Sequence, residues 1–129
     1  MELSYDNLEV GQTFPPTLTR IDREAVRRYV LATGGDYTGS DLAPPTFGHL
    51  LATPRTAVPG AVVPPGGVHT KQAYEFHRPL HVGEEVTTTM RVAEKGERKG
   101  RRYVVYEFEI RAADGALCLV ARMTAIPGR

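Results

Sequence analysis

The chain has 129 residues, a length that suits a single domain with one hydrophobic core. Hydrophobic residues make up 41% of it and charged residues 24%, which is typical of a globular protein. The net charge of +1 gives no overall attraction to nucleic acids or anionic membranes, so we expect neither as a partner. The single cysteine, Cys118, excludes an internal disulfide, and we expect a reducing, cytoplasmic setting. The acidic N-terminal stretch MELSYDNLEVG has no apolar core of a signal peptide, and no apolar run approaches membrane-spanning length.

An extended segment over Gln12–Thr19 is predicted first, and a well-marked helix follows it. Asp22 suits the N-cap, because its carboxylate can accept a hydrogen bond from a free N–H of the first turn. Ile21 and Val26 have the spacing of a hydrophobic staple around that cap. Gly34 is placed to end the helix in a left-handed turn. The charged side chains of this helix are expected to face water, and they are Arg23, Glu24, Arg27 and Arg28.

A second, shorter helix is predicted to begin after Pro44 and Pro45, because proline is tolerated in a first helical turn. Pro54 is expected to kink or stop it. Its apolar face is predicted to consist of Phe47, Leu50, Leu51 and Val58. The stretch Pro59–Gly67 is rich in proline and glycine and predicts a loop.

The remainder of the chain predicts a meander of four antiparallel strands, because apolar residues alternate with polar ones. The alternating apolar faces are Tyr74 and Phe76, then Val86, Thr88, Met90 and Val92, then Val104, Tyr106, Phe108 and Ile110, and finally Leu117, Leu119, Ala121, Met123 and Ala125. Asp114-Gly115 predicts a tight hairpin between the last two strands. The stretch Glu94–Gly100 predicts a longer, glycine-containing hairpin loop between the second and third strands.

Four strands with one apolar face each need a cover, and a helix wrapped by the sheet is the economical solution. We therefore expect one α+β domain over residues 1–129, with an antiparallel sheet wrapped around a central helix. Such a sheet keeps an open edge, which proteins commonly hide by pairing with a second subunit. The expected assembly is a homodimer or a heterodimer with a related subunit.

Several motifs resemble those of the MaoC-like dehydratase family, especially the N-terminal-type domain of (R)-specific enoyl-CoA hydratases. They are VGQTF at residues 10–14, the helix entry at 19–22, LAPPTF at 42–47 and EFHRPLHVGEEV at 75–86. The resemblance covers nearly the whole chain and implies a hot-dog fold. It also implies an acyl thioester of coenzyme A or of acyl carrier protein as substrate, and the reversible hydration of a trans-2-enoyl thioester to a 3-hydroxyacyl thioester as reaction.

The family pattern G-D-x-N-P-x-H is incomplete in this chain. Gly35 and Asp36 are present, but Asp41 stands where the histidine belongs. Asp36 is either the catalytic acid and base or a residue that braces the turn after the helix. Asp41 is a loop residue, a cap for the second helix, or one half of a carboxylate dyad with Asp36.

Two histidines could replace the missing one. His49 on the second helix could face a substrate tunnel, or it could be a packed, hydrogen-bonded side chain. His69, at the start of the first meander strand, is the next candidate. His77 and His81 flank a turn and are expected to be exposed. The spacing of these histidines does not suit metal ligation, so we predict no metal, and no cofactor is expected.

Other residues are candidates for binding the substrate. The start of the second helix could direct N–H groups at the thioester oxygen, which gives Thr46, Phe47 and Gly48 as candidates. Gln72 could hydrogen-bond the thioester or the pantetheine amides, or it could be a polar residue at a strand end. The stretch Arg91–Arg102 contains six basic and two acidic residues. It could meet the phosphates of coenzyme A or an acidic carrier protein, or it could be a solvated turn.

Three functions therefore remain open. The first is a hydratase or dehydratase that uses Asp36 as its acid and base, with His49 or His69 assisting. The second is a non-catalytic subunit that holds the acyl chain while a MaoC-like partner supplies the Asp/His pair, and the missing histidine favours it. The third is a hot-dog acyl-CoA thioesterase, against which the APPTF motif counts.

Overall fold

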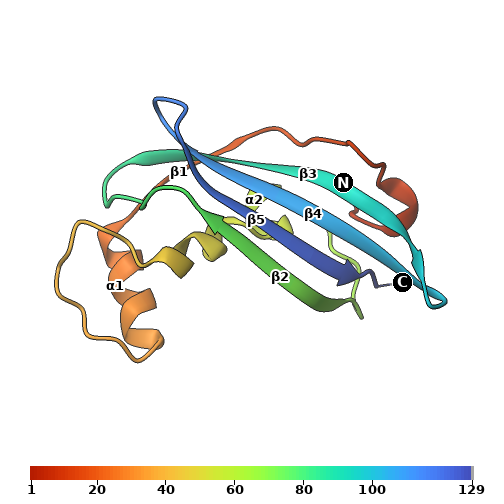
Figure 1. Ribbon diagram of the computed structural model, residues 1–129, viewed down its shortest axis with the longest axis horizontal. Coiled ribbons are helices and arrows are strands. Elements are labelled where there is room, and N and C mark those ends of the chain that lie inside the picture. Colours follow the sequence, from red (N-terminus) through yellow and green to blue (C-terminus); the bar gives the residue numbers. More distant parts are fainter. Residues whose placement is uncertain (129) are drawn as a thin grey trace.

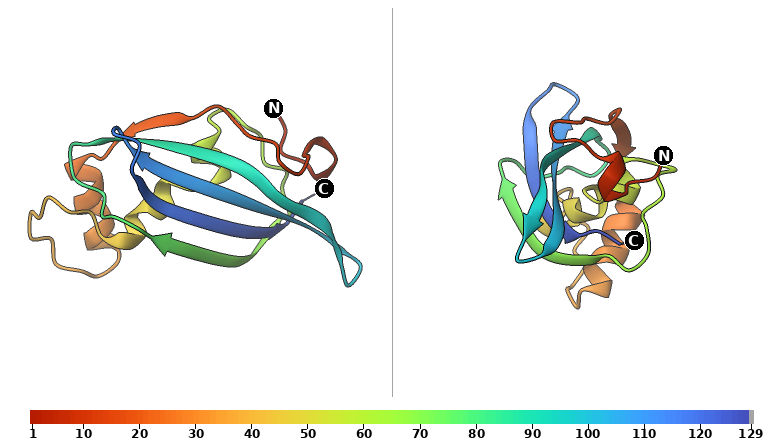
Figure 2. Two further views of the ribbon diagram at one scale, coloured as in Figure 1. Left: turned by 45° about the horizontal axis from the view of Figure 1, so that its top comes forward. Right: turned by 90° about the vertical axis from the view of Figure 1, so that its right-hand side faces the viewer.

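Five antiparallel strands form a single sheet in the order β1-β3-β4-β5-β2, so β1 and β2 are its edges. The structure is a computed structural model that describes residues 1–128 (Figure 1). The strands are β1 (Thr17–Arg20), β2 (Val68–Phe76), β3 (Glu85–Arg98), β4 (Arg101–Ala112) and β5 (Leu117–Ile126). The helices are α1 (Arg23–Ala32), α2 (Pro54–Ala57) and two 3-10 helices, η1 (Tyr5–Asn7) and η2 (Pro45–Leu51). The sheet curves around η2 and α2, which is the hot-dog arrangement (Figure 2).

The inner face of the sheet is apolar because successive side chains of a strand point to opposite faces. The residues predicted to share one face of β3 and of β4 are all buried, namely Val86, Thr88, Met90, Val92, Val104, Tyr106, Phe108 and Ile110. Phe108 and Ile110 are completely enclosed. The prediction of four antiparallel strands around one core is confirmed, but only β3, β4 and β5 form a meander, because β2 pairs with β5 and not with β3.

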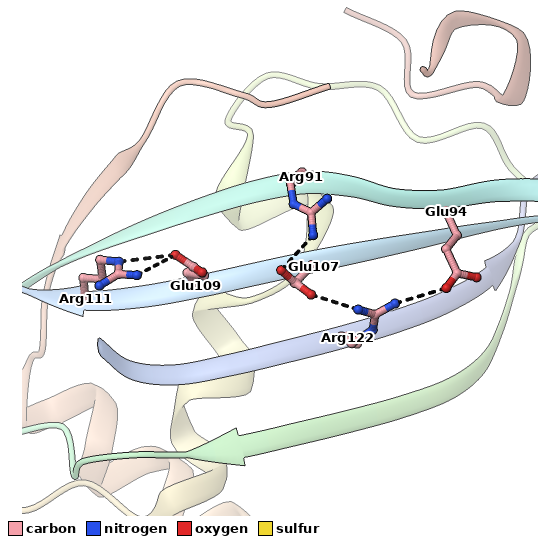
Figure 3. A network of polar contacts seen from close by, with 6 residues as sticks. All are labelled: Arg91, Glu94, Glu107, Glu109, Arg111 and Arg122. Atoms are coloured by element: carbon pink, nitrogen blue, oxygen red, sulfur yellow. Dashed lines mark hydrogen bonds and ion pairs between the residues drawn. The ribbon is translucent and has the colours of Figure 1, made fainter. Parts of the chain in front are cut away.

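The outer face of the sheet carries charged side chains that pair across neighbouring strands (Figure 3). Glu107 on β4 binds Arg91 on β3 at 3.0 Å and Arg122 on β5 at 2.9 Å. Arg122 also approaches Glu94, at 3.4 Å. Each exposed pair contributes only about 0–1 kcal/mol, but together the pairs leave this face with balanced charge. The opposite face of the sheet is therefore the one that holds the core and the cavities.

Helix α1 begins and ends where the sequence predicts. The Asp22 carboxylate accepts a hydrogen bond from the Ala25 N–H at 3.0 Å and caps the first turn. Gly34 has a φ of 83°, and the N–H groups of Gly34 and Gly35 donate to carbonyls of the last turn at 3.2 and 3.0 Å. This left-handed ending turns the chain toward one end of the sheet, beside η2 (Figure 2).

The central helix ends before Pro54, which confirms the predicted stop, and a second short helix begins at that proline. The break has a local cause, because Pro54 has no N–H to continue a helix and instead starts α2. Thr53 caps this new start, and its hydroxyl accepts a hydrogen bond from the Thr56 N–H at 3.2 Å.

Helix η2 lies against the sheet through a glycine. A Cβ on Gly48 would stand 2.6 Å from Leu119 Cδ2, so only glycine allows this close approach. Phe47 is buried at 3% exposure as predicted, whereas Leu50 is 44% exposed and does not belong to the apolar face that we predicted. Leu50 instead presents an apolar side chain to the outside.

The hairpin between β3 and β4 is tighter than the sequence suggests. The predicted long loop over Glu94–Gly100 is wrong, because pairing continues up to a two-residue turn formed by Lys99 and Gly100. Their φ angles are 54° and 76°, as in the primed turns that match the twist of a hairpin. A left-handed backbone conformation costs about 1–2 kcal/mol when the residue is a lysine and not a glycine. At the other end of β4, the Asp114-Gly115 turn is confirmed by a φ of 88° at Gly115.

Candidate functional site

A pocket of about 560 Å³ opens at the end of the sheet where β2 ends and β5 begins. We call it the Asp36 pocket. Its walls come from α1, the loop after α1, the start of η2 and the turn after β2. Apolar walls include Val26, Val30, Phe76 and Leu119. The volume lies in the range of small-molecule sites, which are typically about 300–1,000 Å³ and mostly apolar.

Asp36 is an exposed residue on the rim of this pocket, two residues after the glycine that ends α1. Within residues 1–128 its side chain makes no hydrogen bond and no ion pair. The alternative in which this carboxylate braces the turn through a hydrogen bond therefore has no counterpart in the structure. The carboxylate is free to meet a bound molecule.

The loop that follows Asp36 is held by one arginine of α1. The Arg23 guanidinium donates to the Gly39 carbonyl at 2.9 Å and to the Tyr37 hydroxyl at 3.2 Å, and it pairs with Asp41 at 2.5 Å. The hydrogen bonds with Tyr37 and Asp41 raise the pKa of Arg23. Asp41 is thus held in an ion pair on the outside of the loop and does not line the pocket. The carboxylate dyad with Asp36 is not formed.

His49 is held by a neighbour in the sheet. Its Nδ1 lies 2.6 Å from the Tyr74 hydroxyl on β2, and the two rings meet edge to face with centroids 6.0 Å apart. Burial raises the pKa of Tyr74. Tyr74 in turn stacks on Phe76, at 5.6 Å between centroids, and Phe76 lines the Asp36 pocket. His49 therefore supports the pocket wall from behind and does not line the pocket itself.

His69 lies elsewhere. It lines a second cavity of about 280 Å³ near the start of β2 and the end of β5, and its Nε2 is 3.0 Å from the Lys71 carbonyl oxygen. The structure therefore does not bring Asp36, His49 and His69 together. His77 is the histidine that does line the Asp36 pocket, and it is exposed as predicted. The position of His77 directly after a predicted strand could have indicated a place at the pocket, but we used it only to predict exposure.

Beyond Pro45, the first turn of η2 contacts α1 and the sheet and does not line the pocket. Thr46 shares a hydrogen bond between hydroxyl groups with Tyr29 on α1. Phe47 packs edge-on against Tyr29 at 5.6 Å, and its N–H already donates to the Pro44 carbonyl at 2.9 Å. Gly48 is buried against the sheet. None of Thr46, Phe47 and Gly48 lines the pocket, although the adjoining Pro44 and Pro45 do.

Gln72 shares the inward face of β2 with Tyr74. Both polar atoms of its amide are buried, and neither has a hydrogen-bond partner within residues 1–128. A buried amide without partners is unfavourable by about 1–3 kcal/mol for each missing bond. Gln72 therefore has free capacity for a polar group of a ligand or for a water molecule.

Arg78 forms part of the pocket rim, which the sequence did not indicate. Its guanidinium makes two hydrogen bonds to Glu84, at 2.8 and 3.1 Å, and this pair closes the turn between β2 and β3. Burial raises the pKa of Cys118, which also lines the pocket. Among the described residues, no group of three or more His, Cys, Asp and Glu side chains is placed to hold a metal ion. No helix in residues 1–128 is long and apolar enough to cross a membrane.

Comparisons with known proteins agree with this architecture. Residues 9–122 match the family model described as FAS1-like, dehydratase domain region. The UPF0336 protein PPA1896 of Cutibacterium acnes is 31% identical over 103 residues, which cover 70% of each chain. A chain of the HadBC (3R-hydroxyacyl-ACP dehydratase) complex of Mycobacterium tuberculosis is 25% identical with a TM-score of 0.73, covering 90% of this chain and 95% of that one. The R-hydratase PhaJ1 of Pseudomonas aeruginosa shares the fold with a TM-score of 0.76 at 18% identity, covering 98% and 86%.

Proposed function

Because the chain belongs to the MaoC-like family of hot-dog dehydratases, as the match over residues 9–122 shows, we propose that it is the acyl-binding subunit of a two-subunit 3-hydroxyacyl-thioester dehydratase. The partner in this proposal is a related MaoC-like subunit that supplies the complete Asp/His pair. The substrate is an acyl thioester of coenzyme A or of acyl carrier protein. The free and buried Cys118 suits a reducing compartment, and we propose the cytoplasm.

One observation carries this proposal. Asp36 lies on the pocket rim without a polar partner, and the position expected for histidine holds Asp41, which is paired with Arg23. Reversible hydration needs one group that activates water and another that returns a proton to the α-carbon. Asp36 can be the group that activates water, but the loop after it supplies no second group to return the proton. A second subunit is the simplest source of the complete pair.

The walls of the Asp36 pocket suit the acyl part of such a substrate. Val26 and Val30 of α1 face Leu119 of β5 across a space that contains few polar groups. Burying a methylene group in such surroundings is favourable by about 0.8 kcal/mol, so each added carbon of an acyl chain strengthens binding. The polar rim at Asp36 and Arg78 leaves room for the thioester end to face outward.

The open edge of the sheet supports pairing with a related subunit. Strand β2 spans nine residues and has only β5 as a neighbour. Val68 and Phe76 on this strand remain exposed, and so does Leu50, which follows the residue that bonds Tyr74 of β2. A long unpaired edge with apolar neighbours is normally covered. The HadBC dehydratase, 25% identical to this chain in one comparison, is itself a complex.

The test is an activity assay on this chain alone and on its complex with a MaoC-like partner that has an intact G-D-x-N-P-x-H motif. Crotonyl-CoA and longer trans-2-enoyl-CoAs are the substrates, and loss of enoyl absorbance measures hydration. We expect no hydration by the chain alone and full activity in the complex. Hydration by the chain alone that disappears in Asp36→Asn would overturn the subunit proposal. Release of free thiol would instead identify a thioesterase.

Catalysis by this chain alone is the second candidate, and one specific observation favours it. His77 and Asp36 line the same pocket, from the turn after β2 and the loop after α1. A carboxylate and an imidazole at one site are the pair that this chemistry uses. His77→Gln and Asp36→Asn would then abolish the activity of the isolated chain to the same extent. An isolated chain with no activity would exclude this candidate.

A further inference from the structure

We propose that Arg23 is a positioning residue of the Asp36 pocket, because it holds the loop after α1 in place as one wall of the acyl site. We call residues 36–40 of this loop the loop wall. The inference rests on the proposed function, since it takes an acyl group as the ligand of the pocket. It adds the residue that sets how strongly the pocket prefers long acyl groups to short ones, and it gives Asp41 a role.

The loop wall forms a large part of the pocket surface. Four of its residues line the pocket, namely Asp36, Tyr37, Thr38 and Ser40. The α1 and sheet residues that line the pocket belong to regular secondary structure, which fixes their positions. The loop wall has no such support. Its position, and with it the shape of the pocket, therefore depends on other contacts.

Neither the backbone nor the core holds the loop wall, which projects beyond the end of the sheet (Figure 1). Within residues 1–128 its backbone makes no hydrogen bond to another backbone group. The last such bond before it joins the Gly35 N–H to the Val30 carbonyl at 3.0 Å, and the first after it joins the Val82 N–H to the Asp41 carbonyl at 2.8 Å. Its residues are exposed except for the half-buried Tyr37. A segment of this kind keeps much of its conformational freedom unless side chains from elsewhere order it.

Arg23 supplies the contacts that order the loop wall. One terminal nitrogen of its guanidinium donates to the carbonyls of Gly39 and Ser40, at 2.9 and 3.4 Å, and to the Tyr37 hydroxyl at 3.2 Å. The other terminal nitrogen pairs with Asp41 at 2.5 Å. Arginine suits this role, because its planar guanidinium carries several N–H donors in a fixed arrangement.

The pair with Arg23 also accounts for an aspartate at the position where the family pattern has histidine. The Asp41 carboxylate can make a charge-assisted hydrogen bond with the guanidinium, which is about twice as strong as a neutral one. A neutral imidazole would offer a single acceptor, and a protonated one would repel Arg23. At this position the chain thus holds an anchor for the loop in place of a proton-transfer group. This agrees with a subunit that binds the acyl chain and leaves proton transfer to its partner.

A wall that is ordered before the ligand arrives favours long acyl groups. Each methylene that the pocket buries raises affinity by about fourfold. When Arg23 no longer holds the loop wall, binding must also order the loop, and part of the contact with the acyl chain is lost. A decanoyl group touches the wall with many more atoms than an acetyl group does. The ratio of the affinities for decanoyl-CoA and acetyl-CoA measures this effect, because the coenzyme A part is the same in both.

The experiment measures both affinities by calorimetry on the full chain. In Arg23→Gln we expect the ratio to fall about tenfold, because every contact of the guanidinium with the loop is weakened or lost. Asp41→Ala removes one anchor and should lower the ratio about threefold. The double variant should bind no worse than Arg23→Gln alone, because Asp41 acts through Arg23.

Arg27→Gln is the matched control. It breaks a similarly exposed ion pair on the same helix, in which Arg27 binds Glu24 at 2.7 Å. Within residues 1–128 the Arg27 side chain makes no hydrogen bond to the loop wall. The ratio of affinities should therefore stay as it is in the unmodified chain.

Three outcomes would overturn the inference. They are an unchanged ratio in Arg23→Gln, an equal fall in Arg27→Gln, and a chain that binds neither thioester. Urea denaturation checks that the variants are folded, and if Arg23→Gln is not, an unchanged ratio in Asp41→Ala overturns the inference in the same way. A two-subunit complex that hydrates no enoyl thioester, while the chain shows the expected ratios, would count against the proposed function and support the role of Arg23.

Discussion

Gly48 illustrates how one residue without a side chain determines the position of a helix. Its Cα lies so close to β5 that an added Cβ would stand 2.6 Å from Leu119 Cδ2. We predict that Gly48→Ala lowers the free energy of unfolding by about 1–3 kcal/mol through overpacking. Urea denaturation measures the change. Leu119→Val removes the atom that clashes, so the double variant should be less destabilised than the sum of the two single ones. Simple additivity would contradict this account.

Tyr74 and His49 form a second residue-scale test, because their hydrogen bond lies behind the pocket wall. Tyr74→Phe leaves the His49 Nδ1 half-buried without this partner, and we expect a loss of about 1–2 kcal/mol in unfolding free energy. His49→Gln should likewise reduce stability while the activity of the two-subunit complex changes only a few-fold. A His49→Gln complex with full stability and no activity would instead assign His49 to proton transfer.

Glu84 links the fold to pH. Hydrogen bonds from Arg78, followed by the His81 backbone N–H, hold the pKa of Glu84 below its ordinary value of 4.5. The folded pKa is thus lower than the unfolded one, so this stabilisation is present above pH 4.5 and is lost as pH falls through the lowered pKa. We predict that Glu84→Gln weakens the protein at neutral pH by about 1–3 kcal/mol. It should also flatten the loss of stability in acid, as followed by urea denaturation at several pH values.

The control for this prediction is Glu24→Gln, which removes an exposed carboxylate paired with Arg27 on the surface of α1. The pair with Arg27 also lowers the pKa of Glu24, but this pair is exposed and screened by solvent, so the acid limb of the stability curve should change less than in Glu84→Gln. A Glu84→Gln variant whose curve runs parallel to that of the unmodified protein would show that the turn does not depend on this carboxylate.

At the scale of elements, the sequence predicts what local rules determine. The cap at Asp22, the left-handed end at Gly34 and the alternation along β3 and β4 are each encoded within a few neighbouring residues. Pro54 predicts that the central helix is interrupted, but a proline alone does not tell whether a second helix begins there. The contact of Gly48 with β5 joins residues far apart in the sequence, and no local pattern reveals it.

The candidate site shows the same division. Asp36 was found from a local motif, and it does line a pocket. The role of Arg23 was missed, because its partners lie up to 18 positions further along the chain and a charged first turn normally faces water. The tight turn at Lys99 was missed because lysine is not a residue that signals a left-handed backbone. Residues of this kind, which depart from local preference, are the ones that a function can explain.

At the scale of the whole molecule, the two edges of the sheet are not equivalent. Strand β1 has four residues and β2 has nine, so β2 exposes the longer row of unpaired backbone groups. Leu50 on η2 is 44% exposed, although His49 before it bonds Tyr74 on β2 and Leu51 after it packs against the core. An apolar side chain that leaves the core of its own chain beside an open edge suits an interface.

This asymmetry gives a prediction about assembly. Leu50→Asp should prevent association with the partner subunit, because it places a charge in an apolar contact that loses water on pairing. Leu18→Asp is the matched control, since Leu18 on the other edge strand is 69% exposed and the same charge there should leave the complex intact. Light scattering on the purified complex measures the mass of each variant. If Leu18→Asp dissociates the complex while Leu50→Asp leaves it associated, the interface lies at β1 and not at β2.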